Sequence, residues 1–161
     1  PEKGRRARLL TVLEPAAERV VPPCPVVDQC GGCDWMHLDL AAQRAAPRQL
    51  VADVLARHQL APSGPIAVEQ PTGGARYRSR ARLLIKAAGG QVHVGYRAAR
   101  SHAVTEVSDC HVLAAELVPM FDELRAVLAG SRGDGDAQIA LGRAGLPVLT
   151  LRFRGELAGS A

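Results

Sequence analysis

Long hydrophobic stretches are missing from this sequence of 161 residues. No run of roughly eighteen apolar residues occurs, so the sequence predicts no membrane-spanning helix. The opening Pro-Glu-Lys-Gly-Arg-Arg is not followed by the apolar segment that a secretory signal peptide requires. We therefore expect a cytoplasmic protein, in a reducing compartment where disulfide bonds are rare.

Aromatic residues are also scarce, at 3% of the sequence, so the core must consist mainly of aliphatic side chains. The length is sufficient for one domain with a substantial buried core. A formal net charge of +4 fits an anionic partner without identifying it. Because an initiating methionine is missing and the sequence stops abruptly at Gly-Ser-Ala, we expect a fragment of a longer protein.

Hydrophobic spacing predicts an α+β domain with an antiparallel sheet and two main helices. One helix is expected to begin after Asp39 as its N-cap, with a kink or a restart at Pro47. The other follows an apolar stripe from Leu113 to Leu128. Strands are expected at 8–13, 66–70, 77–86, 91–97, 102–107, 137–143 and 147–153. The third and fourth of these strands, and the last two, are expected to form hairpins, whereas 131–136 is expected to be a mobile turn.

Three of the four cysteines lie in one short run, and the fourth is distant; they are Cys24, Cys30, Cys33 and Cys110. Four converging thiolates hold either a zinc ion or an iron–sulfur cluster. Zinc ribbons usually pair two CxxC knuckles, whereas this sequence has one. The Gly31-Gly32 pair would also let backbone N–H groups approach inorganic sulfide. We therefore favour a cluster over zinc, and place two disulfides third.

Other side chains beside these motifs have simpler interpretations. A histidine next to a cysteine ligand is more often a packing residue, and four cysteines already complete a ligand set, so His37 and His111 are not assigned as ligands. Tyr77 and Tyr96 could stack on nucleobases, but core packing is the favoured role for both.

A basic stretch contains arginine at every second position, at Arg76, Arg78, Arg80 and Arg82. In a strand this spacing places four guanidinium groups on one face. No acidic residue occurs from Arg76 to Arg100, whereas acids predominate from Glu106 to Asp136. Such segregation favours contact with a phosphate backbone. The alternatives are a solvated face, or a strand that forms salt bridges with the later acidic segment.

These motifs together carry a resemblance. In order they are Cys24-x5-Cys30-Gly-Gly-Cys33-x-Trp-Met-His37, Gln43, Arg76-Tyr77-Arg78-Ser-Arg80-Ala-Arg82, Gly95-Tyr96-Arg97, His102, Val104 and Cys110. The set resembles the iron–sulfur-containing RNA uracil-C5 methyltransferases, which form 5-methyluridine in ribosomal RNA and, in some relatives, transfer RNA. The resemblance implies a [4Fe–4S] cluster on Cys24, Cys30, Cys33 and Cys110. It also implies an RNA-facing role for Arg76, Arg78, Arg80, Arg82 and Arg97.

The family's layout implies three parts: a TRAM β-barrel, a central cluster domain and a Rossmann-like domain that binds S-adenosylmethionine. Residues 1–21 would be the end of the TRAM domain, and residues 22–161 an incomplete central domain. Family members attack uracil with a cysteine, but every cysteine here is already assigned to the cluster. No Gly-rich turn between a strand and a helix is found for the methyl donor. We therefore expect the catalytic Rossmann-like domain to be absent, S-adenosylmethionine to bind only the full-length enzyme, and the chain alone to be inactive.

Two rival functions stay open. A zinc-type nucleic-acid-binding module would hold one zinc ion and no sulfide. A single-cluster electron carrier is also possible, although the arginine-rich stretch argues against it. The expected partner is RNA, with ribosomal RNA favoured over transfer RNA. No membrane partner is expected, and a monomer is favoured.

Overall fold

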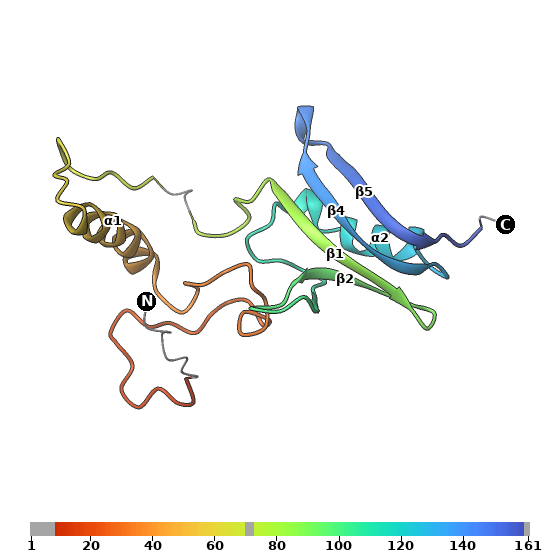
Figure 1. Ribbon diagram of the computed structural model, residues 1–161, viewed down its shortest axis with the longest axis horizontal. Helices are drawn as coiled ribbons and strands as arrows, with labels where there is room; N and C mark the ends of the chain where they lie inside the picture. The colour runs from red at the N-terminus through yellow and green to blue at the C-terminus, as the bar shows by residue number, and fades with distance from the viewer. Residues whose placement is uncertain (1–8, 70–72, 160–161) are drawn as a thin grey trace.

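The computed structural model describes residues 9–69 and 73–159 and contains one five-stranded antiparallel sheet (Figure 1). Its strand order is β3-β2-β1-β4-β5. The strands are β1 (Arg80–Ala88), β2 (Gln91–Arg97), β3 (Val104–Glu106), β4 (Arg132–Leu141) and β5 (Pro147–Glu156). The helices are α1 (Leu40–Arg57) and α2 (Met120–Val127), with short 3-10 turns η1 (Ala115–Leu117) and η2 (Arg143–Gly145). The predicted α+β class, with an antiparallel sheet and two helices, is therefore confirmed.

Both predicted hairpins are present. The β1–β2 turn consists of Gly89 and Gly90, whose φ angles of +61° and +81° fit a two-residue turn that requires positive φ at both positions. Strand β4 pairs with β5 over its whole length, from Arg132 opposite Glu156 to Leu141 opposite Pro147. The central strand β1 pairs with β2 on one side and with β4 on the other.

The mobile turn expected at 131–136 is wrong, because β4 already begins at Arg132. Gly and Asp in this stretch are typical of turns. In the structure, however, the glycines allow close approach to β5: a Cβ at Gly135 would lie 2.1 Å from the carbonyl oxygen of Arg152. Glycine here therefore serves the packing of two strands rather than a turn.

The hydrophobic core lies between the sheet and α2, and Figure 1 shows α2 against one face of the sheet. Strand β1 alternates, with Leu83 and Ile85 buried and their neighbours more exposed. The predicted apolar stripe is confirmed as buried, although its first part forms the 3-10 turn η1 rather than an α-helix. Arg125 of α2 also donates hydrogen bonds to the carbonyl oxygens of Val94 and Val107, at 3.1 and 3.0 Å. These bonds hold α2 against β2.

Helix α1 lies apart from the sheet, and none of its residues is buried (Figure 1). Its N-cap is Asp39, as predicted, and the carboxylate accepts a hydrogen bond of 2.7 Å from the Ala42 N–H. The expected restart at Pro47 is wrong, because α1 is assigned as one helix through this residue. Among the described residues, no helix has both the length and the apolar character needed to cross a membrane.

Two of the predicted strands are wrong. Residues 9–13 and 66–69 have no regular structure, while residues 8 and 70 lie outside the described residues. A short apolar run becomes a strand only where a neighbouring strand accepts its hydrogen bonds. Leu10 and Leu13 are instead 83% and 89% exposed. Hydrophobic spacing alone therefore did not reveal that these two runs lack a partner strand.

Candidate metal centre

The four cysteines meet at one small cavity, although three come from the 24–33 loop and the fourth from the segment after β3. All four are free thiols, so the two-disulfide alternative is not realised. Cys110 is buried, and the other three are half-buried. The remaining walls are mostly apolar and include Val26, Val27, Met36, Tyr96 and Val107. The chain thus brings thiols from two distant segments into one apolar environment.

Backbone contacts fix the loop against the end of β2. The carbonyl oxygen of Val26 accepts hydrogen bonds from the N–H groups of Gln29 and Cys30, at 3.0 and 2.8 Å. Gly31 N–H donates to the carbonyl oxygen of Arg97 at 3.0 Å. A Cβ at Gly31 would lie 3.1 Å from that same oxygen. Gly31 therefore allows the loop to approach β2, while Gly32 is the glycine that lines the cavity.

The environment of the thiols opposes free thiolates. Burial raises the pKa of Cys30 and of Cys33, and the neighbouring cysteine thiols raise both further. The Arg78 guanidinium acts in the opposite direction on the pKa of each thiol. These mutual effects require the sulfur atoms to lie near one another. A positively charged metal centre would therefore be needed to hold all four as thiolates.

The described residues contain no preassembled metal-ion site. Within the residues that the structure describes, no three His, Cys, Asp or Glu side chains form a group that could hold a metal ion. A tetrahedral zinc site requires four sulfur atoms at about 2.3 Å from the same ion. The thiols thus share a cavity without converging on a single point.

The predicted arginine stripe is only partly correct. Arg76 and Arg78 precede β1, and Arg76 has a φ of +53°, which is incompatible with a strand. Only Arg80 and Arg82 belong to β1. Arg82 forms a salt bridge of 2.9 Å with Asp136 of β4. Arg82 thus pairs with the later acidic segment, which was the alternative to phosphate contact.

Arg76 and Arg78 instead support the cysteine site. Arg76 forms a bidentate pair with Asp109 and donates a hydrogen bond of 3.0 Å to the carbonyl oxygen of Cys110. This pair lowers the pKa of the Asp109 carboxyl. Arg78 lines the cysteine cavity and makes a long hydrogen bond, 3.4 Å, to the carbonyl oxygen of Gly32. The sequence favoured phosphate contact for both residues. Its alternative, pairing with the acidic segment from Glu106 to Asp136, is realised for Arg76 through Asp109. The contact of Arg78 with the cysteine loop was not predicted.

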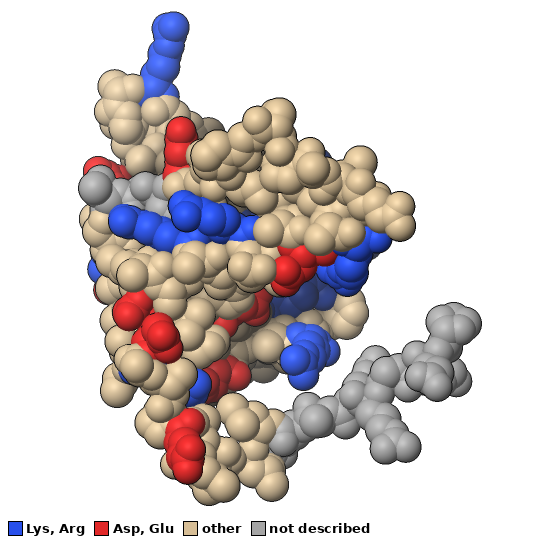
Figure 2. All heavy atoms as spheres, turned by 90° about the vertical axis from the view of Figure 1, so that its left-hand side faces the viewer, with Lys and Arg blue, Asp and Glu red and all other residues tan. Residues whose placement is uncertain are grey.

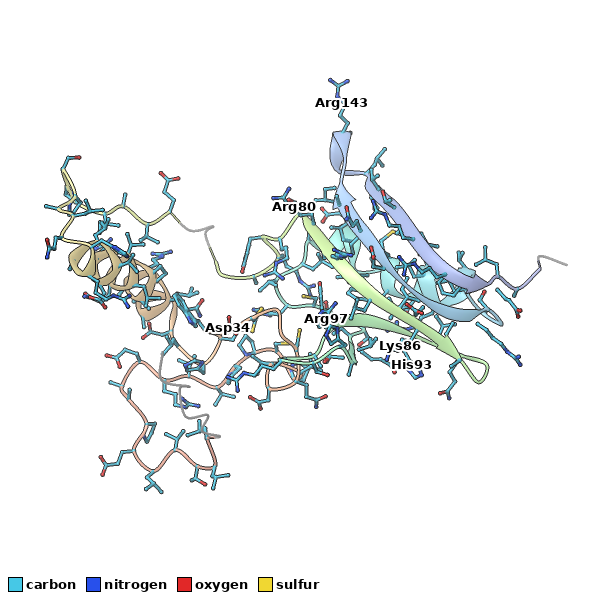
Figure 3. The ribbon with its side chains drawn as sticks, viewed as in Figure 1. Asp34, Arg80, Lys86, His93, Arg97 and Arg143 are labelled. Atoms are coloured by element: carbon cyan, nitrogen blue, oxygen red, sulfur yellow. The ribbon has the colours of Figure 1, made fainter. Side chains whose placement is uncertain are left out.

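On the sheet, basic and acidic side chains occur together. The register places Asp134 of β4 opposite Lys86 of β1 and Arg154 of β5. Arg97 of β2 contacts His102. Figure 3 shows Arg143 extending from the β4–β5 tip, away from Lys86 and Arg97. At the end of the molecule seen in Figure 2, basic and acidic residues are likewise interspersed.

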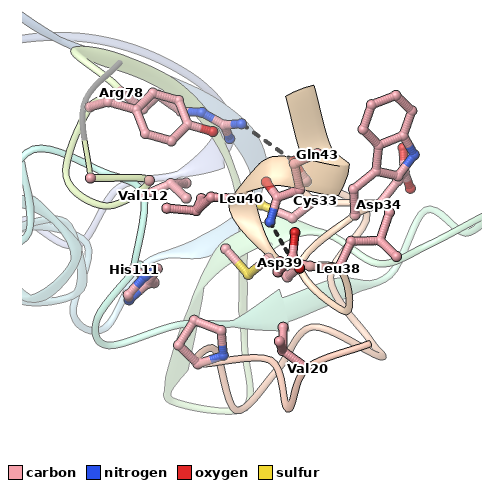
Figure 4. Close-up of a pocket in the computed structure, with 17 residues that line it drawn as sticks. Val20, Cys33, Asp34, Leu38, Asp39, Leu40, Gln43, Arg78, His111 and Val112 are labelled. Carbon is pink, nitrogen blue, oxygen red and sulfur yellow. Dashed lines mark hydrogen bonds between the residues drawn. The ribbon is translucent and has the colours of Figure 1, made fainter. Parts of the chain in front are cut away.

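A larger groove of about 630 Å³, which the sequence did not predict, adjoins the cysteine cavity (Figure 4). Cys33, Arg78 and His111 line both the groove and the cavity. Trp35 and Tyr77 are two further lining residues. Tyr77 is 44% exposed, so the core role expected for it is wrong. In the sequence, the position of Trp35 next to the cysteine motif was a signal that could have indicated this groove.

Comparison with known proteins gives matches over most of the chain. No protein-family model matches. A protein of Halomonas elongata named 23S rRNA (uracil(1939)-C(5))-methyltransferase RlmD is 38% identical over 120 residues, which cover 74% of this chain and 25% of that protein. Proteins of the same name from Shewanella baltica (strain OS155) and Vibrio vulnificus (strain CMCP6) are 40% and 34% identical, over 70% and 96% of this chain.

The chain spans only a part of these relatives, 25% of the Shewanella protein and 36% of the Vibrio protein. Identity of 34–40% over most of this chain confirms the family predicted from the cysteine and arginine motifs. Over most of its length, the chain therefore belongs to the same family as these 23S rRNA (uracil-C5)-methyltransferases.

Proposed function

We propose that the chain is the cluster-binding and RNA-recognition part of an RNA (uracil-C5) methyltransferase that acts on ribosomal RNA. Its four cysteines, Cys24, Cys30, Cys33 and Cys110, are proposed to hold a [4Fe–4S] cluster. The observation that carries this proposal is that thiols from two distant segments line one largely apolar cavity. The names of the relatives support the assignment to ribosomal RNA.

The donor set fits a cluster better than a single zinc ion. Four cysteine thiols are the usual ligands of a cubane, and each binds a different iron. In such a ligand set the sulfur atoms therefore surround a larger group than one ion. A bound cluster would supply a covalent link between the 24–33 loop and Cys110. The cluster together with its four thiolates carries a net negative charge, part of which Arg78 would offset.

RNA contact is proposed for the basic residues of the sheet. Arg80 and Arg97 form no salt bridge with an acid among the described residues, and Arg82 is 64% exposed despite its bond to Asp136. Arg78 faces the groove beside the metal centre. The role of Arg76 is instead proposed to be internal, because its guanidinium is occupied by Asp109 and Cys110.

No catalytic residue is assigned within the chain. With all four cysteines bound to the cluster, no thiol would be left to attack uracil. S-adenosylmethionine and the base-modifying groups are proposed to belong to other parts of the full-length enzyme. We likewise propose that residues 1–21 belong to a TRAM domain and that residues 22–161 belong to the central domain. The chain by itself is proposed to be inactive as a methyltransferase.

Metal analysis tests the proposal most directly. After anaerobic purification, we expect about four iron and four sulfide per chain. The C24A variant should lose most of both, whereas the control H37Q should retain them, because His37 does not line the cavity. One zinc ion without sulfide would contradict the cluster and favour the zinc-type module.

A further inference from the structure

The hydroxyl of Tyr96 is buried without a hydrogen-bond partner among the described residues. Tyr96 lies on β2, and only 8% of its surface is exposed. Buried polar groups in proteins almost always have a partner, since an unpaired one has lost its hydrogen bonds to water. The unpaired hydroxyl therefore indicates that a further group supplies, or creates, a hydrogen-bond acceptor for Tyr96.

The hydroxyl belongs to the cysteine site. Tyr96 lines the same cavity as the four cysteines, and its ring packs edge-to-face on Phe121, with centroids 6.1 Å apart and planes at 71°. The backbone of Tyr96 is paired with Thr105 in the sheet. These contacts fix the ring from two sides, so the hydroxyl cannot swing to solvent. The core role expected from the sequence is confirmed for the ring, but it does not account for the hydroxyl.

The Cys110 thiol is the neighbour that matters for this hydroxyl. Tyr96 and Cys110 line the same cavity, Cys110 is the buried thiol of the four, and a neutral phenol can donate a hydrogen bond. By ordinary hydrogen-bond geometry the hydroxyl has no partner among the described residues, the Cys110 thiol included. A neutral thiol is a weak acceptor, whereas a thiolate is a strong, charge-assisted one. The bond therefore becomes favourable once Cys110 is a metal ligand.

We propose that the Tyr96 hydroxyl donates a hydrogen bond to the metal-bound Cys110 thiolate. Cys110 is buried, whereas the other three cysteines are half-buried and can receive hydrogen bonds from water. Hydrogen bonds to cluster sulfurs withdraw electron density and raise the reduction potential. Tyr96 is thus a positioning residue that sets the potential and the persistence of the metal centre. This inference rests on the proposed function, since it requires a metal-bound thiolate.

The Y96F variant removes the donor and keeps the ring. Y77F is the matched control: it removes the hydroxyl of the other tyrosine, which is exposed and does not line the cysteine cavity. On anaerobically prepared chain we expect Y96F to shift the reduction potential to a more negative value and to speed the loss of cluster in air several-fold. Y77F should match the wild type in both. Resonance Raman spectra should show the Fe–S(Cys) stretch of Y96F at higher frequency.

A second measurement covers the case in which Y96F assembles no cluster. In the Y77F chain Tyr96 is the remaining tyrosine, so biosynthetic incorporation of 3,5-difluorotyrosine changes this residue alone. The fluorinated hydroxyl is a stronger donor, and we expect the potential to become more positive.

The outcomes separate the two proposals. If the wild type holds four iron and four sulfide but neither Y96F nor difluorotyrosine moves the potential, the role of Tyr96 is refuted and the cluster stands. A hydroxyl bonded to a water molecule would give that result. If the wild type holds no cluster, both proposals fail.

Discussion

Arg76 and Asp109 form a bidentate ion pair, with Nη1–Oδ1 and Nη2–Oδ2 distances of 2.6 and 2.8 Å. Asp109 immediately precedes the last cysteine, and Arg76 also donates to the carbonyl oxygen of that cysteine, Cys110. A residue whose spacing predicted RNA contact therefore fixes the backbone that presents Cys110. The four alternating arginines therefore lie in two different places. Arg76 and Arg78 contact the cysteine site, whereas Arg80 and Arg82 belong to the sheet.

The D109N variant should show a stability difference that depends on pH. The pKa of Asp109 is lowered in the folded chain, so its ionised form stabilises the fold above the unfolded value of about 4, and this contribution is lost as pH falls through the lower folded value. Because the pair is exposed, we expect D109N to cost at most about 1 kcal/mol near neutral pH. The difference from wild type should shrink as pH falls below about 4 and vanish once Asp109 is protonated in the folded chain as well.

Urea unfolding of the metal-free chain at several pH values measures this difference without interference from acid loss of metal. The control D122N removes an acid from an exposed pair within α2. A D109N deficit that persists unchanged into acid would mean that the Asp109 charge is not the cause.

The G31A variant should disturb the cysteine loop. Its Cβ would lie 3.1 Å from a backbone oxygen of β2, so either the loop or the strand must move. We expect a loss of about 1–3 kcal/mol, typical of overpacking, together with reduced iron content. G64A is the control, because a Cβ at Gly64 meets nothing within 4 Å. Equal iron content and equal unfolding midpoints for G31A and G64A would contradict a close-approach role for Gly31.

How far the sequence predicted the site depends on the kind of signal. The sequence was sufficient to predict that the four cysteines share one site, because their residue type and spacing already indicate a common chemistry. The hairpin turn at Gly89 was equally local. The strand expected at residues 9–13 is absent because strand pairing is decided by segments distant in the sequence. The strand position expected for Arg76 is wrong because alternating residue types do not reveal a positive φ, which is +53° here. The groove beside Cys33 unites segments from three parts of the chain, which no local pattern encodes.

Arginines of the sheet should govern RNA binding. We expect the double variant R80A/R97A to weaken binding of a ribosomal RNA fragment and to reduce the salt slope by about 0.7–0.9 for each lost phosphate contact. R82A should have a smaller effect, because Arg82 is already bonded to Asp136. R57A serves as the control, since Arg57 is the last residue of α1, which lies apart from the sheet (Figure 1).

Fluorescence anisotropy at several salt concentrations gives both the affinity and the slope. If the slope change of R80A/R97A is no more than twice that of R57A, binding depends on net charge alone and no phosphate contact belongs to these residues.

The F121A variant should weaken both the core and the metal centre. Phe121 is fully buried between α2 and the sheet, and truncation of such a ring typically costs about 3–5 kcal/mol. It also removes the edge-to-face contact that holds the ring of Tyr96 beside the cysteines, so iron should be lost faster in air. V127A on the same helix is the control, because Val127 is 72% exposed and its truncation should cost less than about 0.5 kcal/mol. Urea unfolding and the rate of iron release measure the two effects. A destabilised F121A chain that releases iron at the V127A rate would show that the position of the Tyr96 ring does not depend on Phe121.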